Sequence, residues 1–177
     1  TKLQQALPAG SDLTVYDALA LAFAETGKLL AHYHHLLEET AKGSFGQKQQ
    51  DQLSRLQEQI DHADGWSFDH KILGMLNRFN LDGSATLDQL SGGWLRRLAI
   101  ARSLVTEPDV WLLDEPTNHL DIPTIDWLEQ ELVQFSGTIV FVTHDRRLMQ
   151  AVATSIVDID RGKLSRWDCD YQTFLTR

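Results

Sequence analysis

The chain has 177 residues, 42% of them hydrophobic, and a formal net charge of −9 at pH 7. This length allows one compact domain or two small subdomains of a larger one, and the negative charge argues against this segment binding nucleic-acid phosphates by itself. The sequence has neither an apolar run of roughly 20 residues nor a secretory signal, so we expect a cytoplasmic protein without a membrane span.

The first half of the chain is predicted to be helical. Between residues 13 and 79, apolar residues recur at the spacing of four helices. Thr14 followed by Asp17 is typical of a capping box that opens the first of them. The helical pattern is expected to break at Gly27, at the 42–46 stretch and at Gly65. The second and third helices flank a short Gly/Ser turn, so they could pack as an antiparallel hairpin.

Ser91-Gly92-Gly93 precedes an amphipathic segment and is expected at the N-terminus of a helix. Unpaired backbone N–H groups and a dipole worth about half a charge make such a helix end an anion site. The glycines would let a phosphate approach closely. The serine could cap the helix or donate a hydrogen bond to the phosphate.

The second half of the chain is predicted to contain strands. Val110–Leu113 and Thr138–Val142 are short apolar runs typical of strands buried on both faces. A helical pattern lies between them, which predicts a crossover helix and a parallel pair. Residues 155–160 and 163–167 are expected to form a closing hairpin. The predicted fold class is α/β, with a helical subdomain, a parallel-strand core and a C-terminal β-hairpin.

Polar residues follow both predicted strands where these end. Asp114 and Glu115 follow the first, and His144 follows the second. The carboxyl ends of parallel strands meet at one edge, where such sheets bind ligands. There Asp114 could hold Mg²⁺ through water, Glu115 could polarise an attacking water, and His144 could contact a terminal phosphate. The alternative is that these are ordinary solvated residues at the ends of strands. It is less favoured, because the residues from Asp114 to Asp121 form the string DEPTNHLD.

Several motifs resemble those of ABC ATPases. LSGGW resembles the signature motif, where LSGGQ is more usual, and LLDEPTNHLD resembles the Walker B strand and D-loop. FVTHD resembles the H-loop, and Leu3-Gln4-Gln5 resembles the end of the Q-loop. The EPTNHLD string, Trp94 in place of Gln, and IDWLE narrow the resemblance to the ABC-F family, to the first nucleotide-binding domain of its Uup-like members. The resemblance covers nearly the whole chain.

The resemblance implies a partial P-loop-type ABC ATPase domain. Residues 1–88 would hold the Q-loop end and an α-helical subdomain with the family's arm region. Residues 89–177 would hold the signature helix, Walker B, D-loop and H-loop. ATP and Mg²⁺ are the implied cofactors, with ATP bound between this domain and a second ABC domain of the same protein.

The same resemblance implies a role for each matching residue. Glu115 would be the catalytic base and His144 the switch histidine, while Asp114 and Gln5 would serve the metal. Gln5, the signature residues Ser91, Gly92 and Gly93, and the D-loop residue Asp121 would contact the nucleotide or the interface that holds it.

The chain shows no P-loop of its own. Gly27-Lys28-Leu29 has Ala22 where the first glycine should stand and Leu29 in place of the required Ser or Thr. The segment alone is therefore expected to be inactive. ATP hydrolysis is expected of a longer protein with a P-loop upstream of Thr1.

Three classes of function remain open at this point. ABC-F members act on ribosomes during translation, and Uup-like members are also linked to DNA binding and to limiting transposon excision. A transporter ATPase subunit would use the same hydrolytic residues, although the Asn118-His119 D-loop and Trp94 favour ABC-F and no membrane partner is expected. A non-catalytic helical interaction module is the third class.

His32, His34 and His35 lie close together in sequence but are expected on a solvated helix face rather than in a metal site.

Overall fold

The computed structural model describes residues 12–43, 46–118 and 120–176. The described part divides into two compact units, with the division between Pro108 and Asp109. The first unit is helical, and the second contains two small sheets with helices between and after their strands. The expected boundary between residues 88 and 89 separates sequence motifs rather than compact units, and it stays a prediction.

The first unit follows the predicted helical pattern. Its elements are α1 (Val15–Ala20), the 3₁₀ turn η1 (Leu21–Phe23), α2 (Ala24–Lys42), α3 (Gln47–His62), α4 (Gly65–Arg78), the 3₁₀ turn η2 (Leu87–Gln89) and α5 (Gly92–Leu104). The four helices expected before residue 79 are confirmed. The capping box is confirmed as well, since Thr14 Oγ1 accepts from Asp17 N (3.1 Å) and Asp17 Oδ2 accepts from Thr14 N (2.9 Å).

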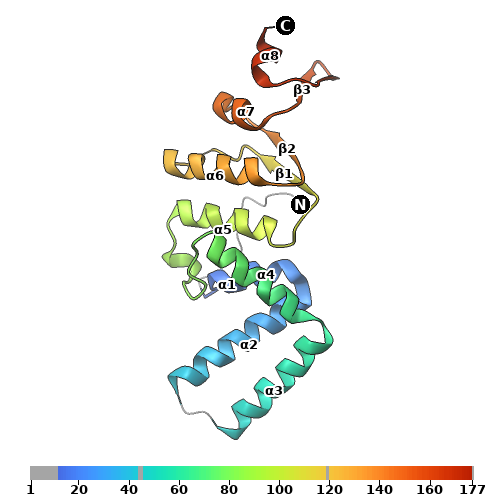
Figure 1. Cartoon of the computed structure of the whole chain (residues 1–177). Coiled ribbons are helices and arrows are strands. Elements are labelled where there is room, and N and C mark those ends of the chain that lie inside the picture. Colours follow the sequence, from blue (N-terminus) through green and yellow to red (C-terminus); the bar gives the residue numbers. More distant parts are fainter. Residues whose placement is uncertain (1–11, 44–45, 119, 177) are drawn as a thin grey trace. The chain divides into compact units, whose positions relative to one another are not determined.

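Helices α2 and α3 pack against each other as the predicted hairpin and are the two long helices labelled in Figure 1. Their facing sides bury Leu36, Leu53 and Leu56, and Leu29 and Tyr33 pack against this cluster. These positions lie three or four residues apart on each helix, so they share one face. The apolar spacing of the sequence is therefore what joins the two helices.

Gly27 does not break the helical pattern, contrary to expectation. It lies buried inside α2, and a Cβ built there would be 1.8 Å from the carbonyl oxygen of Ala20 at the end of α1. The chain turns between the two helices at η1 and at Ala24, whose φ is 50°. Gly27 thus allows the backbones of α1 and α2 to approach closely. The other expected breaks in the helical pattern, at 42–46 and before Gly65, are confirmed.

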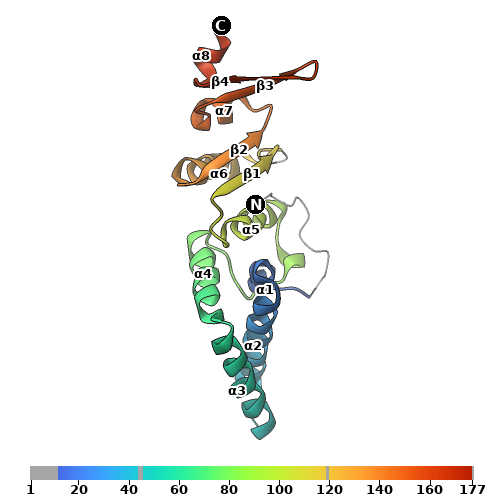
Figure 2. The same cartoon turned by 90° about the vertical axis from the view of Figure 1, so that its right-hand side faces the viewer.

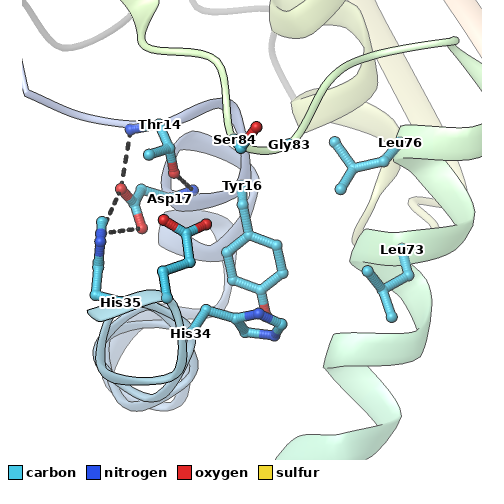
Figure 3. A pocket seen from close by; sticks show the side chains of 10 residues that line it. Thr14, Tyr16, Asp17, His34, His35, Leu73, Leu76, Gly83 and Ser84 are labelled. Carbon is cyan, nitrogen blue, oxygen red and sulfur yellow. Dashed lines mark hydrogen bonds and ion pairs between the residues drawn. The ribbon is translucent and has the colours of Figure 1, made fainter. Parts of the chain in front are cut away.

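A polar network joins α1, α2 and α4. Tyr16 Oη donates to Asp69 Oδ1 (2.5 Å), and His34 Nε2 lies 3.0 Å from the same oxygen. His35 Nε2 lies 2.9 Å from Asp17 Oδ2, beside the pocket drawn in Figure 3. The expectation of a solvated face is wrong for His34, which is half-buried, whereas His35 remains exposed. A nearly buried carboxylate from another helix reaches each of them. Among the described residues, no group of three or more His, Cys, Asp or Glu could hold a metal ion.

Asp69 makes the stability of this unit depend on pH. Burial raises the pKa of Asp69, but hydrogen bonds from His34 and Tyr16 outweigh it and hold the pKa below its ordinary value. Such a carboxylate stabilises the fold above its unfolded pKa of about 4, and this contribution is lost as the pH falls through the folded pKa.

We therefore expect Asp69→Asn to lower the free energy of unfolding by about 1–3 kcal/mol at neutral pH, because Tyr16 and His34 lose a charged acceptor. The difference from the wild type should shrink below about pH 4. Urea denaturation followed by far-UV circular dichroism at neutral pH and near pH 3 measures both values. An equal difference at the two pH values would contradict the assignment.

The second unit begins with the predicted strand–helix–strand motif. Strand β1 (Val110–Asp114) and strand β2 (Thr138–Val142) are parallel, with Val110 opposite Thr138, and α6 (Ile122–Gln134) connects them. The chain continues through α7 (Arg146–Val152), β3 (Ile156–Asp160), β4 (Lys163–Trp167) and α8 (Tyr171–Leu175). β3 and β4 form the predicted hairpin, seen edge-on in Figure 2. Its turn residues Arg161 and Gly162 both have positive φ, as a two-residue hairpin turn requires.

The parallel strands are not buried on both faces, contrary to expectation. Trp111 and Leu113 are buried, and the Trp111 ring lies 5.4 Å from that of Phe135, just after α6. On the other face, Leu112 and Val140 remain 41% and 53% exposed. A run of apolar residues does not say how many faces of a strand are covered, and in the described residues this sheet has two strands.

None of the described helices is long and apolar enough to cross a membrane.

Candidate functional site

The carboxyl ends of β1 and β2 lie side by side. Asp114, the last residue of β1, stands opposite Val142, the last residue of β2. The Glu115 N–H then donates to the Val142 carbonyl (2.8 Å), which extends the strand contact by one residue. Glu115 itself has a φ of 44°, in the left-handed region, so the chain turns sharply there. Such strained positions are common at functional sites.

This turn brings Glu115 to His144. The His144 backbone N–H donates to Glu115 Oε2 (3.4 Å), and the His144 ring Nε2 lies 3.4 Å from Glu115 Oε1. The Glu115 side chain is 19% exposed, whereas the His144 side chain is 98% exposed. The strand ends thus hold a largely covered carboxylate against a solvent-exposed imidazole. A carboxylate placed in this way can accept a proton from a water molecule, and the imidazole can donate to an anion.

Asp114 lies on the exposed face of β1, because the burial of that strand alternates and places Trp111 and Leu113 on the other face. Its carboxylate is exposed and supplies the hard oxygen donors that Mg²⁺ prefers. This donor set fits an ion that keeps most of its water shell and takes its other ligands from phosphates. It does not fit an all-protein metal cage, since the described residues contain none.

The predicted anion site at Ser91 lies at the N-terminus of α5, in the first compact unit. Ser91 is the residue before the helix and makes no capping hydrogen bond through its side chain within the described residues. A Cβ built on Gly92 would meet nothing within 4 Å. Trp94 stacks with Arg97, whose guanidinium carbon lies 4.9 Å from the ring centre. The helix end therefore presents an exposed hydroxyl and open backbone to solvent, and the predicted helix start after Ser91 is confirmed.

The remaining predicted site residues stand as follows. Asp121 caps α6, because its Oδ1 accepts a hydrogen bond from Thr124 N (3.1 Å). Gln5 and His119 lie outside the described residues. The structure thus brings Glu115 and His144 into contact, with Asp114 adjacent, and it gives Asp121 a capping bond; the catalytic, cofactor and metal roles of these residues stay predictions.

The sequence analysis missed the residues that anchor the segment after His144. Asp145 caps α7 by accepting from Arg147 N (2.9 Å) and Leu148 N (3.2 Å). The Arg147 side chain reaches Asp126 on α6. An Asp directly before a helical pattern is a readable capping signal, but nothing in the sequence pairs Arg147 with a residue of another helix.

Comparison with known proteins decides the family. The ABC transporter family model matches residues 14–118, more than half of the chain. The chain belongs to the ABC transporter family. As an ABC protein it is a member of a family of ATP-binding proteins, and the motifs at Ser91 and Asp114 lie within the matched range.

Three relatives of this ABC chain are similar over nearly its whole length. The ATP-binding protein Uup of Haemophilus influenzae is 42% identical, with 99% of this chain and 27% of that protein covered. Uup of Escherichia coli is 44% identical, with 98% and 27% covered. The energy-dependent translational throttle protein EttA of Mycobacterium tuberculosis is 35% identical, with 99% and 31% covered. The resemblance to Uup-like ABC-F ATPases is confirmed, and the chain spans less than a third of the length of these relatives.

A solved structure supports the fold of the ABC chain. It is the dimeric post-hydrolysis state of the ATP-binding cassette MJ0796 bound to ADP and Pi, with a TM-score of 0.55 and 23% sequence identity. The match covers 94% of this chain and 61% of that one. The predicted fold class, a partial ABC ATPase domain with a helical subdomain and parallel strands, is confirmed.

Proposed function

We propose that the protein containing this ABC domain binds ATP between two ABC domains, hydrolyses it, and uses the cycle to act on ribosomes during translation. The observation that supports hydrolysis best is the contact between the Glu115 carboxylate and His144 at the carboxyl ends of parallel strands. ABC-family membership, the similarity to Uup and the similarity to EttA support the rest.

In this proposal Glu115 accepts the proton of the attacking water. The His144 N–H holds one carboxylate oxygen and the imidazole lies against the other, so the carboxylate is oriented before a substrate arrives. His144, being exposed, can donate to the terminal phosphate. Asp114 would hold Mg²⁺ through water, and the bound ion would neutralise charge on the phosphates.

The other predicted residues would contact the ATP held by the second ABC domain, or lie at the interface between the two domains. The backbone of Gly92 and Gly93 and the Ser91 hydroxyl would bind the γ-phosphate of ATP held by the opposite domain. The open space at Gly92 and the absence of a side-chain cap from Ser91 within the described residues support this assignment. Gln5 would contact Mg²⁺ and the attacking water, and Asp121 would lie at the interface between the domains.

The ribosome is the proposed target because EttA, a relative at 35% identity, is named a translational throttle protein. The exposed α2–α3 hairpin would be the arm that reaches the target. DNA is the second candidate by resemblance to Uup-like proteins, but the net charge of −9 gives this segment little attraction for phosphates.

The proposal is tested by sedimenting the full-length protein with ribosomes in ATP and Mg²⁺. We expect Glu115→Gln, which keeps the side-chain shape but removes the base, to trap the ATP-bound form and to raise the ribosome-bound fraction several-fold over the wild type. Asp158→Asn, which removes an exposed carboxylate from β3, serves as the matched control and should behave as the wild type. A trapped variant that binds duplex DNA but leaves ribosomes in the supernatant would favour the DNA-binding alternative.

A further inference from the structure

We propose that Arg147 is a positioning residue for ATP hydrolysis: it clamps α7 to α6 and so holds His144 at the Glu115 carboxylate. Arg147 is the second residue of α7 and follows His144 by three positions. The inference rests on the proposed function, because it assigns Arg147 an effect on the hydrolytic step.

The clamp consists of one guanidinium and two carboxylates. Arg147 Nη2 donates to Asp126 Oδ1 (2.5 Å) and to Glu129 Oε2 (3.4 Å), and Nε lies 3.2 Å from Glu129 Oε1 as an ion pair. The last contact lacks the alignment of a hydrogen bond. Asp126 and Glu129 lie three residues apart on α6, so they present their carboxylates on the same side of that helix. A rigid, planar guanidinium suits two such acceptors better than the point charge of a lysine.

The clamp matters because His144 has little else to fix it. Its side chain is 98% exposed, and both of its contacts with Glu115 are long, at 3.4 Å. The segment is held on one side by β2 and on the other by α7, whose first turn is capped by Asp145. Because His144 lies two residues before α7, we expect a shift of α7 relative to α6 to move the His144 backbone N–H relative to the Glu115 carboxylate.

The clamp also joins the two segments that leave the strand ends. Helix α6 begins one residue after Asp121, and Asp126 stands in its second turn. Helix α7 begins two residues after His144. Arg147 thus ties the helix of the predicted D-loop to the helix of the predicted H-loop within one compact unit.

The position of the clamp on the surface separates this role from a purely structural one. The Arg147 side chain is 60% exposed and that of Asp126 is 47% exposed. Ion pairs of this kind contribute little to stability, whereas a misplacement of about 1 Å at a reacting group can lower a rate by about 10²-fold. Loss of the clamp should therefore slow hydrolysis while leaving folding and ATP binding nearly intact.

The test uses the full-length protein in single-turnover ATP hydrolysis, together with the Kd for ATP and the melting temperature. We expect Arg147→Gln to slow hydrolysis at the site completed by Glu115 by about tenfold, within the range for misplaced groups, with Kd changed by less than about twofold. Arg166→Gln breaks a more exposed ion pair, between Arg166 on β4 and Asp168, and should leave the rate unchanged. The charge swap Arg147→Asp with Asp126→Arg should restore most of the rate.

Two results would overturn the inference. One is a wild-type rate in Arg147→Gln while Glu115→Gln abolishes hydrolysis at the site that Glu115 completes, since the proposed function then stands without the clamp. The other is a charge swap that stays as slow as Arg147→Gln. If Glu115→Gln itself hydrolyses ATP at the wild-type rate, the proposed function fails and the clamp loses its role with it.

Discussion

Glu115→Gln is expected to leave about one ATP molecule uncleaved per full-length protein when the wild type has hydrolysed all that it binds. The amide can still accept the His144 N–H, so the geometry at the strand ends is kept. It cannot take a proton from water, and loss of a positioned general base lowers a rate by about 10²–10⁴-fold. Rapid filtration of protein loaded with γ-labelled ATP, followed by separation of ATP from phosphate, measures the retained nucleotide.

The matched control for this prediction is Asp158→Asn, which makes the same chemical change at an exposed position of β3. It should release phosphate at the wild-type rate. Complete release of phosphate from Glu115→Gln at that rate would remove Glu115 from the catalytic role. Retention of uncleaved ATP in both variants would show that the effect is not specific to the Glu115 carboxylate.

Gly27→Ala is expected to destabilise the helical unit by about 3 kcal/mol or more, at the upper end of the costs of overpacking. The added Cβ would lie 1.8 Å from the Ala20 carbonyl oxygen and 2.6 Å from its carbon. Both atoms belong to backbone, so no side-chain rotation relieves the clash. The gain in helix propensity from alanine, about 1 kcal/mol, is too small to offset it.

Gly74→Ala is the matched control, because Gly74 also lies inside a helix, α4, but is exposed and would give its Cβ no neighbour within 4 Å. Here only the propensity gain remains, and we expect about 1 kcal/mol of stabilisation. Urea denaturation followed by far-UV circular dichroism measures both variants. Equal effects of the two substitutions would show that the close approach of α1 and α2 is not maintained in solution.

The parts of the fold that the sequence predicts well are those set by local pattern. The helical spacing predicts the α2–α3 hairpin, and the capping box at Thr14 marks the start of α1. The apolar run 138–142 coincides with β2. Each of these signals depends on a few neighbouring residues, so tertiary contacts do not need to be known in advance.

The features that the sequence predicts poorly are those set by contact between distant segments. Gly27 resembles a helix breaker, and only the nearby Ala20 carbonyl shows that it serves a close approach. His34 and His35 resemble a solvated pair, and only α1 and α4 bring carboxylates to them. Leu112 resembles a doubly buried strand residue, yet one face of its sheet is open. None of these partners could be chosen from spacing alone.

The candidate site follows the same division. Asp114, Glu115 and His144 could be predicted because residues at the ends of neighbouring parallel strands meet at one edge, and the structure brings Glu115 and His144 into contact. Two features could not be predicted: the left-handed turn at Glu115 and the contact of Arg147 with α6. Both depend on how the segments after the strands pack.

The central claim is that Glu115 and His144 act as one hydrolytic unit, and a double-mutant cycle on the single-turnover hydrolysis rate tests it most directly. Groups that act together lose most of their effect when either one is removed. The account predicts that the double variant Glu115→Gln, His144→Ala is about as slow as the slower single variant. Rate losses that multiply in the double variant, or a wild-type rate in either single variant, would contradict it.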